Sequence, residues 1–211
     1  MCLINFYVMD VQLLIGSFVA LLALINPIQK IFVITSLQNQ FSDKELRYLS
    51  AKSTFTALII LIFFLFLGHL IFNYVFHIQL YAFQVTCGVV LFYNGITGLQ
   101  KGAFLQVDQN VKLSDLSAVP IAMPMIAGPA TITAVVTFPA HYGKPITIIA
   151  IILALSINLL LMLFAENIGR IFSKFNLMNA LIRITGLIVA TIGVQMVFTG
   201  ITNFIGTLVA K

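Results

Sequence analysis

The sequence predicts an all-α integral membrane protein with six transmembrane helices. The helices form two inverted three-helix repeats, and helices one and four are broken near the midplane. Composition is the first reason, because 61% of the 211 residues are hydrophobic, 8% are charged and the mean hydropathy is +1.10, whereas a soluble domain is nearer a quarter charged. The second reason is a set of six long apolar stretches. The third is a proline inside two of them, at Asn26-Pro27 and Gly128-Pro129, 102 residues apart.

The apolar stretches are predicted to be the spans. A helix needs about 20 apolar residues to cross a bilayer, so six spans use most of the chain and leave no separate soluble domain. We therefore treat 1–211 as a single membrane domain. The first stretch is too long for one straight span, which agrees with a break at Asn26-Pro27. In order, the predicted spans are roughly 11–37, 54–76, 80–100, 118–138, 146–166 and 183–206.

The connections between the spans predict the orientation. Those near 77–79 and 139–145 are short, whereas those near 38–53, 101–117 and 167–182 are longer and polar. Loops rich in Lys and Arg face the cytoplasm, so the longer loops are expected inside and both termini outside. The predicted cytoplasmic side holds Lys44, Arg47, Lys52, Lys101, Lys112, Arg170, Lys174 and Arg183, against Lys144 and Lys211 on the other side.

Matched positions indicate an internal repeat of about 1–100 and 118–211. A shift of 102 residues places Pro27 on Pro129, and a shift of 98 places two glycines of span three on two of span six. Each half has three spans, and an odd number inserts the second half upside down, as in many secondary transporters. The glycines of each pair are seven residues apart and share one helix face, where we expect close helix packing rather than ligand contacts. The matched glycines are Gly88 with Gly186 and Gly95 with Gly193.

The two proline positions are also where we expect a binding site. Asn or Gly followed by Pro is typical of a helix start, as N-cap and first helical residue. Free N–H groups inside the membrane are tolerated only where they are buried in protein or line a cavity, and a helix N-terminus attracts an anion such as a carboxylate. The predicted substrate-binding residues are Asn26, Pro27, Gln29, Gly128, Pro129, Ala130, Thr131 and Thr133.

The side chains near the breaks have different expected roles. Asn26 and Gln29 could bond the ammonium or the polar atoms of a zwitterion, and the Thr131 and Thr133 hydroxyls could add contacts. For Thr131, bonding back to a carbonyl of its own helix is an equal alternative. We expect Lys30, toward the cytoplasmic end of span one, to snorkel to the interface rather than to line the site.

Polar residues elsewhere in the spans are expected to be structural. Asn158 and Gln195 are candidates for interhelical hydrogen bonds, and His69 is expected to be packed and hydrogen-bonded rather than to relay protons. No Asp or Glu lies at the centre of a span, which argues against coupling through a buried carboxylate. No metal-ligand spacing and no nucleotide-binding loop is present, so no cofactor is predicted.

Three stretches resemble the signatures of a known family. The first is Asn26-Pro27-Ile28, the second runs from Val119 to Ile132 through Ala127-Gly128-Pro129, and the third runs from Arg183-Ile184-Thr185-Gly186-Leu187 to Phe198-Thr199-Gly200-Ile201. Over nearly the whole chain they are similar to the MarC family of six-span bacterial inner-membrane proteins.

The MarC resemblance implies the bacterial inner membrane as the location, so that both termini are expected in the periplasm. It also implies a place among the LysE-like transporters, since some MarC members are described as neutral amino acid transporters. The chain departs from the family pattern at Gln29, Lys30 and Phe32, where the family has Gly, a small or neutral polar residue, and Pro. These departures affect the expected substrate.

Together these observations predict a secondary transporter or exporter of a small zwitterionic solute, with a neutral amino acid as the candidate. The alternative is a membrane protein with an assembly or interaction role and no transport activity, because packing glycines serve that role too. An enzyme is not predicted, since no nucleophile, acid and base are clustered. The expected partners are the solute and membrane lipid, and a homo-oligomer is left open. Nucleic acid is not expected, because the net charge of +5 reflects membrane topology.

Overall fold

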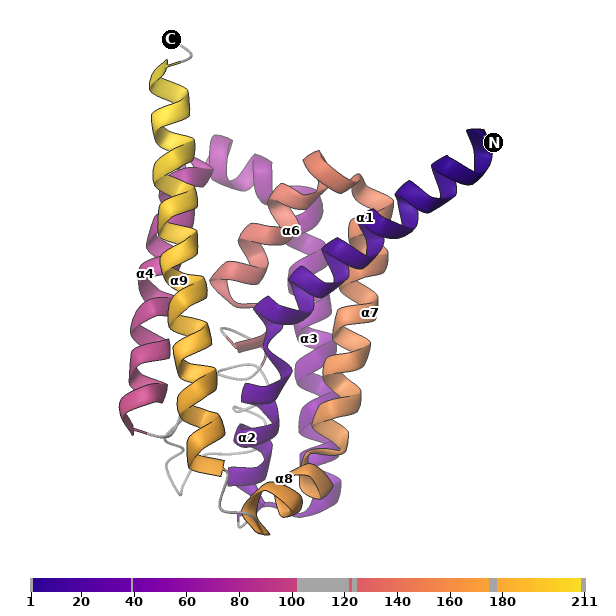
Figure 1. Ribbon diagram of the computed structural model, residues 1–211, viewed down its shortest axis with the longest axis vertical. Coiled ribbons are helices and arrows are strands. Elements are labelled where there is room, and N and C mark those ends of the chain that lie inside the picture. The colour runs from indigo at the N-terminus through magenta and orange to yellow at the C-terminus, as the bar shows by residue number, and fades with distance from the viewer. Residues whose placement is uncertain (1, 39, 102–121, 123–124, 175–177, 210–211) are drawn as a thin grey trace.

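The computed structural model describes residues 2–38, 40–101, 122, 125–174 and 178–209, and every regular element in this part of the chain is helical (Figure 1). A π-helical segment, η1, continues one of the α-helices directly. The elements are α1 (Cys2–Ile25), α2 (Pro27–Leu37), α3 (Asp43–Leu70), η1 (Ile71–Val75), α4 (Leu80–Lys101), α6 (Pro129–Tyr142), α7 (Lys144–Leu163), α8 (Ala165–Lys174) and α9 (Met178–Val209).

Five described segments are long and apolar enough to cross a membrane, and they match the first, second, third, fifth and sixth predicted spans. The fourth predicted span, 118–138, falls partly on residues outside the described ranges, and its second half lies in α6, a helix of 14 residues. The five segments are Val11–Leu37, Asp43–Val75, Leu80–Gln100, Lys144–Leu163 and Ala180–Val209.

Helix α3 begins well before the apolar stretch that predicted it. The sequence predicted a polar connection over 38–53 and a span from 54, whereas α3 starts at Asp43. Glu45 is the reason, because its carboxylate accepts from the Ser42 amide at 2.8 Å and from the Ser42 hydroxyl at 2.7 Å. This contact satisfies a donor that would otherwise be unpaired at the helix start, so the helix extends through the polar residues.

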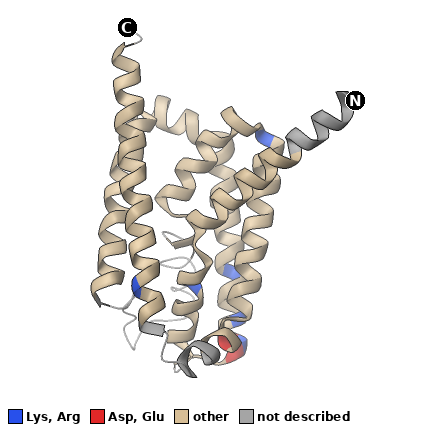
Figure 2. Cartoon of the chain, in the orientation of Figure 1, with Lys and Arg blue, Asp and Glu red and all other residues tan. Residues whose placement is uncertain are grey.

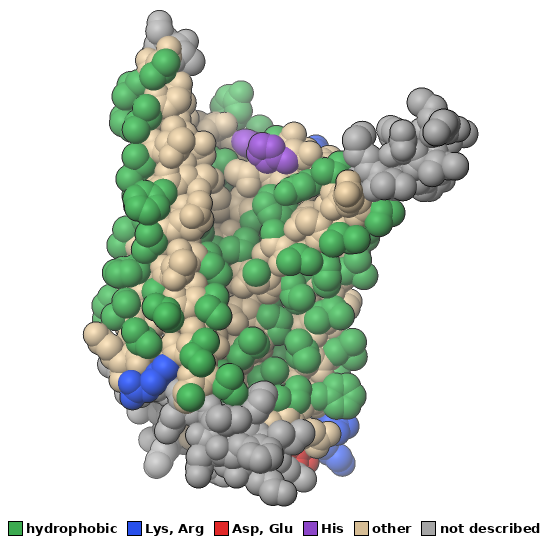
Figure 3. Space-filling model, viewed as in Figure 1, with side chains coloured by type: hydrophobic (Ala, Val, Ile, Leu, Met, Phe, Trp, Pro, Cys, Tyr) green, Lys and Arg blue, Asp and Glu red, His purple; other side chains and the backbone are tan. Residues whose placement is uncertain are grey.

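The helices form two groups. Helices α4 and α9 lie side by side as one pair, and α1, α2, α3, α6, α7 and α8 form the other group (Figure 1). The hydrophobic core belongs mainly to the second group and includes Leu21, Leu61, Val135 and Ile151, each fully buried. The pair contacts that group through α6 and α2. Large apolar side chains such as Phe55 and Phe63 remain exposed. Hydrophobic side chains cover much of the surface seen in Figure 3, as expected of a surface that faces lipid.

Glycines hold α4 and α9 at close distance, as the sequence predicted. A Cβ atom added at Gly88 would lie 2.5 Å from the Gly193 carbonyl oxygen, and one added at Gly95 would lie 2.6 Å from the Gly186 carbonyl oxygen. Real Cβ atoms essentially never approach a neighbour below 3.0 Å. The packing role predicted for these four glycines is therefore confirmed.

A second pair of glycines makes similar contacts in the other group of helices. A Cβ added at Gly68 of α3 would collide with the side chain of Val136 in α6. A Cβ added at Gly169 of α8 would lie 2.5 Å from the Thr35 hydroxyl of α2. In both contacts the opposing atoms belong to a side chain, so a larger residue at either glycine would force Val136 or Thr35 to shift.

Most of the described charged residues lie toward one end of the molecule (Figure 2). Lys44, Arg47 and Lys52 lie at the start of α3 and Arg183 near the start of α9, at one end. Lys144 begins α7 at the opposite end, where the described chain also starts and finishes (Figure 1). The charge asymmetry expected from the sequence is therefore present along the long axis of the bundle.

Candidate functional site

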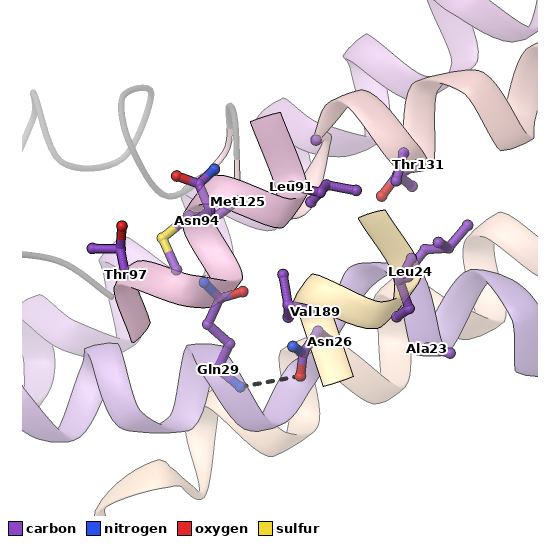
Figure 4. Close-up of a pocket in the computed structure, with 13 residues that line it drawn as sticks. Ala23, Leu24, Asn26, Gln29, Leu91, Asn94, Thr97, Met125, Thr131 and Val189 are labelled. Atoms are coloured by element: carbon purple, nitrogen blue, oxygen red, sulfur yellow. Dashed lines mark hydrogen bonds between the residues drawn. The ribbon is translucent and has the colours of Figure 1, made fainter. Parts of the chain in front are cut away.

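A cavity of about 170 Å³ lies where the two proline junctions meet α4 and α9. Figure 4 shows how its lining residues surround it. It is lined by five of the predicted binding residues, namely Asn26, Gln29, Gly128, Ala130 and Thr131. The other lining residues are Ala23, Leu24, Leu91, Asn94, Thr97, Met125, Val189 and Ile192.

At the first junction, α1 ends at Ile25 and α2 begins at Pro27, with Asn26 in the left-handed region at φ 54° and ψ 71°. Asparagine tolerates this conformation better than most residues. The Asn26 side-chain oxygen accepts from the Gln29 amide at 3.4 Å (Figure 4), so Asn26 caps its own helix. The Asn26 Nδ2 atom is buried and has no partner among the described residues. One free donor therefore remains at this junction.

At the second junction, Gly128 is the N-cap of α6, in extended conformation at φ −77° and ψ 168°. No side chain caps the helix, which begins at Pro129. The Ile132 amide donates to the Gly128 carbonyl at 2.8 Å. Ala130 and Thr131 lie between these positions and line the cavity. The uncapped start of α6, with its partial positive charge, therefore opens on the cavity.

The structure does not bring every predicted residue to the cavity wall. Pro27 and Pro129 start their helices but are not among the lining residues. The Thr133 hydroxyl donates back to the Pro129 carbonyl at 2.9 Å, the behaviour that the sequence had raised for Thr131. Thr131 itself lines the cavity.

Sequence reasoning missed the contribution of α4 and α9. Asn94 and Thr97 of α4, with Val189 and Ile192 of α9, complete the cavity wall. Asn94 carried a usable signal, because it is a polar residue inside an apolar stretch, the criterion that drew attention to Asn158. The two apolar residues of α9 carried none.

A family model described as MarC family integral membrane protein matches residues 11–205. The chain belongs to the MarC family. The chain is 34% identical to a UPF0056 membrane protein of Pyrococcus horikoshii, over 93% of this chain and 96% of the relative. It is 30% identical to one of Aquifex aeolicus, over 92% and 94%, and 29% identical to one of Bacillus subtilis, over 92% and 97%. No solved structure matches the chain significantly.

Family membership confirms the predicted resemblance and makes this chain a multi-pass integral membrane protein. The relatives' names give a membrane location and no substrate. The chemistry of the MarC site must therefore be derived from its own residues.

A second cavity of about 420 Å³ adjoins the first in this MarC protein and shares Leu24, Ala130 and Ile192 with it. It reaches His141 and Tyr142 in the last turn of α6, at the end of the molecule where the chain starts and finishes. Figure 3 shows the surface hollowed between α9 and α1 toward that end. The polar lining of the second cavity also includes Gln84, Thr133, Thr137, Gln195, Thr199 and Asn203. The Asn203 amide donates to the Gln84 amide oxygen at 3.0 Å.

Lys30 does not snorkel, contrary to the expectation from the sequence. Its side chain is 1% exposed. The ammonium donates to the Ile25 carbonyl and, at 2.6 Å, to the Met125 carbonyl. Both carbonyls belong to the proline junctions, and they draw the amine inward rather than toward the interface. Lys30 is not among the lining residues of the cavity, so it lies behind the cavity wall.

The interhelical hydrogen bonds expected at Asn158 and Gln195 are also corrected within the described part of the chain. The Asn158 amide donates to the Met162 sulfur of its own helix at 3.3 Å, and its buried oxygen has no partner there. Gln195 is exposed and lines the second cavity. His69 is exposed near the end of α3 rather than packed inside it.

Proposed function

We propose that this MarC protein is a secondary transporter or exporter of a small zwitterionic solute, such as a neutral amino acid, that binds in the 170 Å³ cavity. The observation that carries the proposal is the meeting of two donor groups on one cavity. The uncapped N-terminus of α6 opens on it, and Asn26, whose buried Nδ2 atom has no partner among the described residues, lines it. Buried donors without partners are energetically unfavourable, and a bound solute would satisfy them.

The donor groups suit a carboxylate. Helix N-terminal amides carry partial positive charge and point at the ligand, and the Thr131 hydroxyl adds a third kind of donor. No Asp or Glu of the described residues lines the cavity, so no carboxylate in this part of the chain repels an anion there. Because Asn26 already caps α2, the carboxylate is expected at α6 rather than shared equally between both helix starts.

Acceptors for an ammonium group lie on the same cavity. Ala23 is four residues before Pro27, which has no N–H, so the Ala23 carbonyl lacks its usual helical partner. Asn94 and Gln29 add amide oxygens. A zwitterion would therefore find complementary groups for both of its charges.

The volume of the first cavity suits a small solute. A cavity of roughly 150 Å³ can hold benzene, so a cavity of about 170 Å³ suits a solute of similar size. A small neutral amino acid fits this volume.

Reciprocal contacts support the two inverted repeats and the breaks within spans one and four. Gly88 contacts Gly193 while Gly95 contacts Gly186, and the members of each equivalent pair are 98 residues apart. Gly68 contacts Val136, and its counterpart Gly169 contacts Thr35, with equivalent residues 101 apart. Such exchange of partners is what a two-fold axis between two inverted halves produces. The proline junctions then occupy equivalent positions on either side of that axis.

The second cavity provides a route for the solute on one side of the membrane. By the charge pattern, the end with the termini is periplasmic and the end with the start of α3 is cytoplasmic. On this assignment, the route opens toward the periplasm of a bacterial inner membrane. Movement of the α4–α9 pair against the other helices would close this route and open the opposite one.

The alternative of an assembly protein without transport activity is less well supported. It rested on glycines that could pack against another molecule. Gly88, Gly95, Gly186 and Gly193 instead pack against one another within the chain, so they leave no small-residue groove for a partner there.

Uptake of a panel of labelled neutral amino acids into proteoliposomes tests the proposal. Gly128→Leu places a bulky side chain in the cavity, and its extended backbone accepts a side chain without strain. Gly16→Leu is the matched control, because nothing lies within 4 Å of a Cβ at Gly16. We expect the wild type and Gly16→Leu to transport the same solute and Gly128→Leu to lose both binding and uptake. Normal binding by Gly128→Leu would place the solute elsewhere, and no uptake of any amino acid by the wild type would contradict the substrate class.

A further inference from the structure

Lys30 is a cation buried among the membrane helices without a carboxylate partner in the described part of the chain. Its ammonium bonds two main-chain carbonyls from segments 95 residues apart, Ile25 and Met125. The proposed solute cavity does not include it. Charged groups inside a membrane are unfavourable and are retained for a role.

Both carbonyls have lost their usual helical partners at the proline junctions. Met125 is four residues before Pro129, which has no N–H to donate. Ile25 is four residues before Gln29, but the Gln29 amide bonds the Asn26 carbonyl at 3.2 Å and the Asn26 side chain at 3.4 Å instead. The Ile25 carbonyl also ends α1, where the helix dipole is negative. Two acceptors with partial negative charge therefore converge on one point.

Converging carbonyls at broken helices are the groups with which transporters hold sodium ions. We propose that the Ile25 and Met125 carbonyls form a monovalent-cation site, and that the Lys30 ammonium occupies it as a permanently attached ion. The wild type consequently needs no free sodium or potassium ion at this position. The inference does not depend on the transported solute, because it concerns a site behind the cavity wall.

The competing explanation is a hydrogen-bonded clip, in which the Lys30 ammonium only joins the two junctions. A clip and a cation site differ in their response to added metal ions. A clip needs a donor, which a metal ion does not supply. A cation site emptied of the lysine amine accepts a small metal ion at the same carbonyls. Removal of the amine therefore separates the two explanations.

The test is thermal unfolding of the purified full-length chain in detergent, with sodium, potassium or choline chloride at equal concentration. We expect Lys30→Ala to unfold at a lower temperature than the wild type in choline. Sodium or potassium should raise its midpoint saturably, by roughly 5–10 °C at a hundred times the dissociation constant. The wild type and Lys44→Ala, which removes an exposed lysine of α3, should unfold at the same temperature in all three salts.

Lys30→Met serves as a second variant, because it fills most of the volume of the lysine stem without a charge. An ion-specific rise in either variant supports the site, and equal midpoints in all three salts for both variants overturn it. If neither variant can be purified in choline, the preparation is repeated in sodium throughout. Folded protein obtained only in sodium supports the site, and failure in both salts overturns it.

Discussion

Substitution of Gly95 tests whether the close approach of α4 and α9 holds the molecule together. A Cβ at this position would lie 2.6 Å from the Gly186 carbonyl oxygen and 2.7 Å from the Ala190 Cα atom. The Ala190 amide nitrogen would be nearer still, and ordinary van der Waals contact begins at 3.4 Å, so the two helices would have to move apart by about 1 Å to accept a methyl group. The opposing atoms are main chain and cannot turn aside as a side chain can.

The expected magnitude follows from that displacement. A radial gap of about 0.5–1 Å already forfeits a quarter to a half of each dispersion contact, and overpacking generally lowers the free energy of unfolding by about 1–3 kcal/mol. Gly→Ala also raises helix propensity by about 1 kcal/mol, which would mask part of the effect. Gly206→Ala in α9 carries the same propensity gain, and nothing lies within 4 Å of its Cβ, so the difference between the two variants isolates the packing term.

The assay is thermal unfolding of the two purified variants in the same detergent. Gly95→Ala should unfold about 2–12 °C below Gly206→Ala, since 1 kcal/mol shifts the midpoint by about 2–4 °C in a chain of this size. Equal midpoints would refute the reasoning, because the α4–α9 contact could then widen freely. The same variant should weaken solute binding, because Asn94 and Val189 bring the two helices to the cavity.

Two further predictions concern the site and the orientation. Thr131→Ala should weaken solute binding by at most about tenfold, the loss of one hydrogen bond. Thr133→Ala should leave the affinity unchanged, because the Thr133 hydroxyl bonds the Pro129 carbonyl. Isothermal titration with the transported solute measures both affinities, and equal affinities in the two variants would show that Thr131 makes no contact with the solute. A reporter active only in the periplasm, fused after Lys211, should be active, and a reporter in the connection before α3 should be silent. A silent C-terminal fusion would reverse the predicted topology.

Local features of the structure followed from the sequence. Proline fixes φ and removes one donor wherever it stands, so the helix starts at Pro27 and Pro129 could be predicted from neighbouring residues alone. The glycines of α4 and α9 were also assigned correctly, because a seven-residue spacing places small side chains on one face in any straight helix. The start of α3 was predicted too late, because apolar periodicity does not register a polar first turn held by Glu45.

The site depended on contacts that no local pattern encodes. Asn94 and Thr97 reach the cavity only because α4 packs against α9 and α6. Thr131 lines the first cavity whereas the Thr133 hydroxyl bonds the Pro129 carbonyl, and this difference depended on which face of α6 meets that cavity. Lys30 was misjudged because its sequence position near a predicted interface said nothing of Met125, whose carbonyl the fold brings to it.

The sequence by itself determined that this chain is a membrane protein, where the two helices that start with proline begin, and which glycines of α4 and α9 would pack. These properties depend on composition and on a few neighbouring residues. The tertiary structure decided which polar groups share a cavity, which carbonyls meet a buried ammonium and which end of the bundle is hollowed. The physical reason is that hydrophobicity and backbone geometry act locally. Hydrogen bonding inside a bilayer must instead be completed between segments that are distant in sequence and adjacent in space.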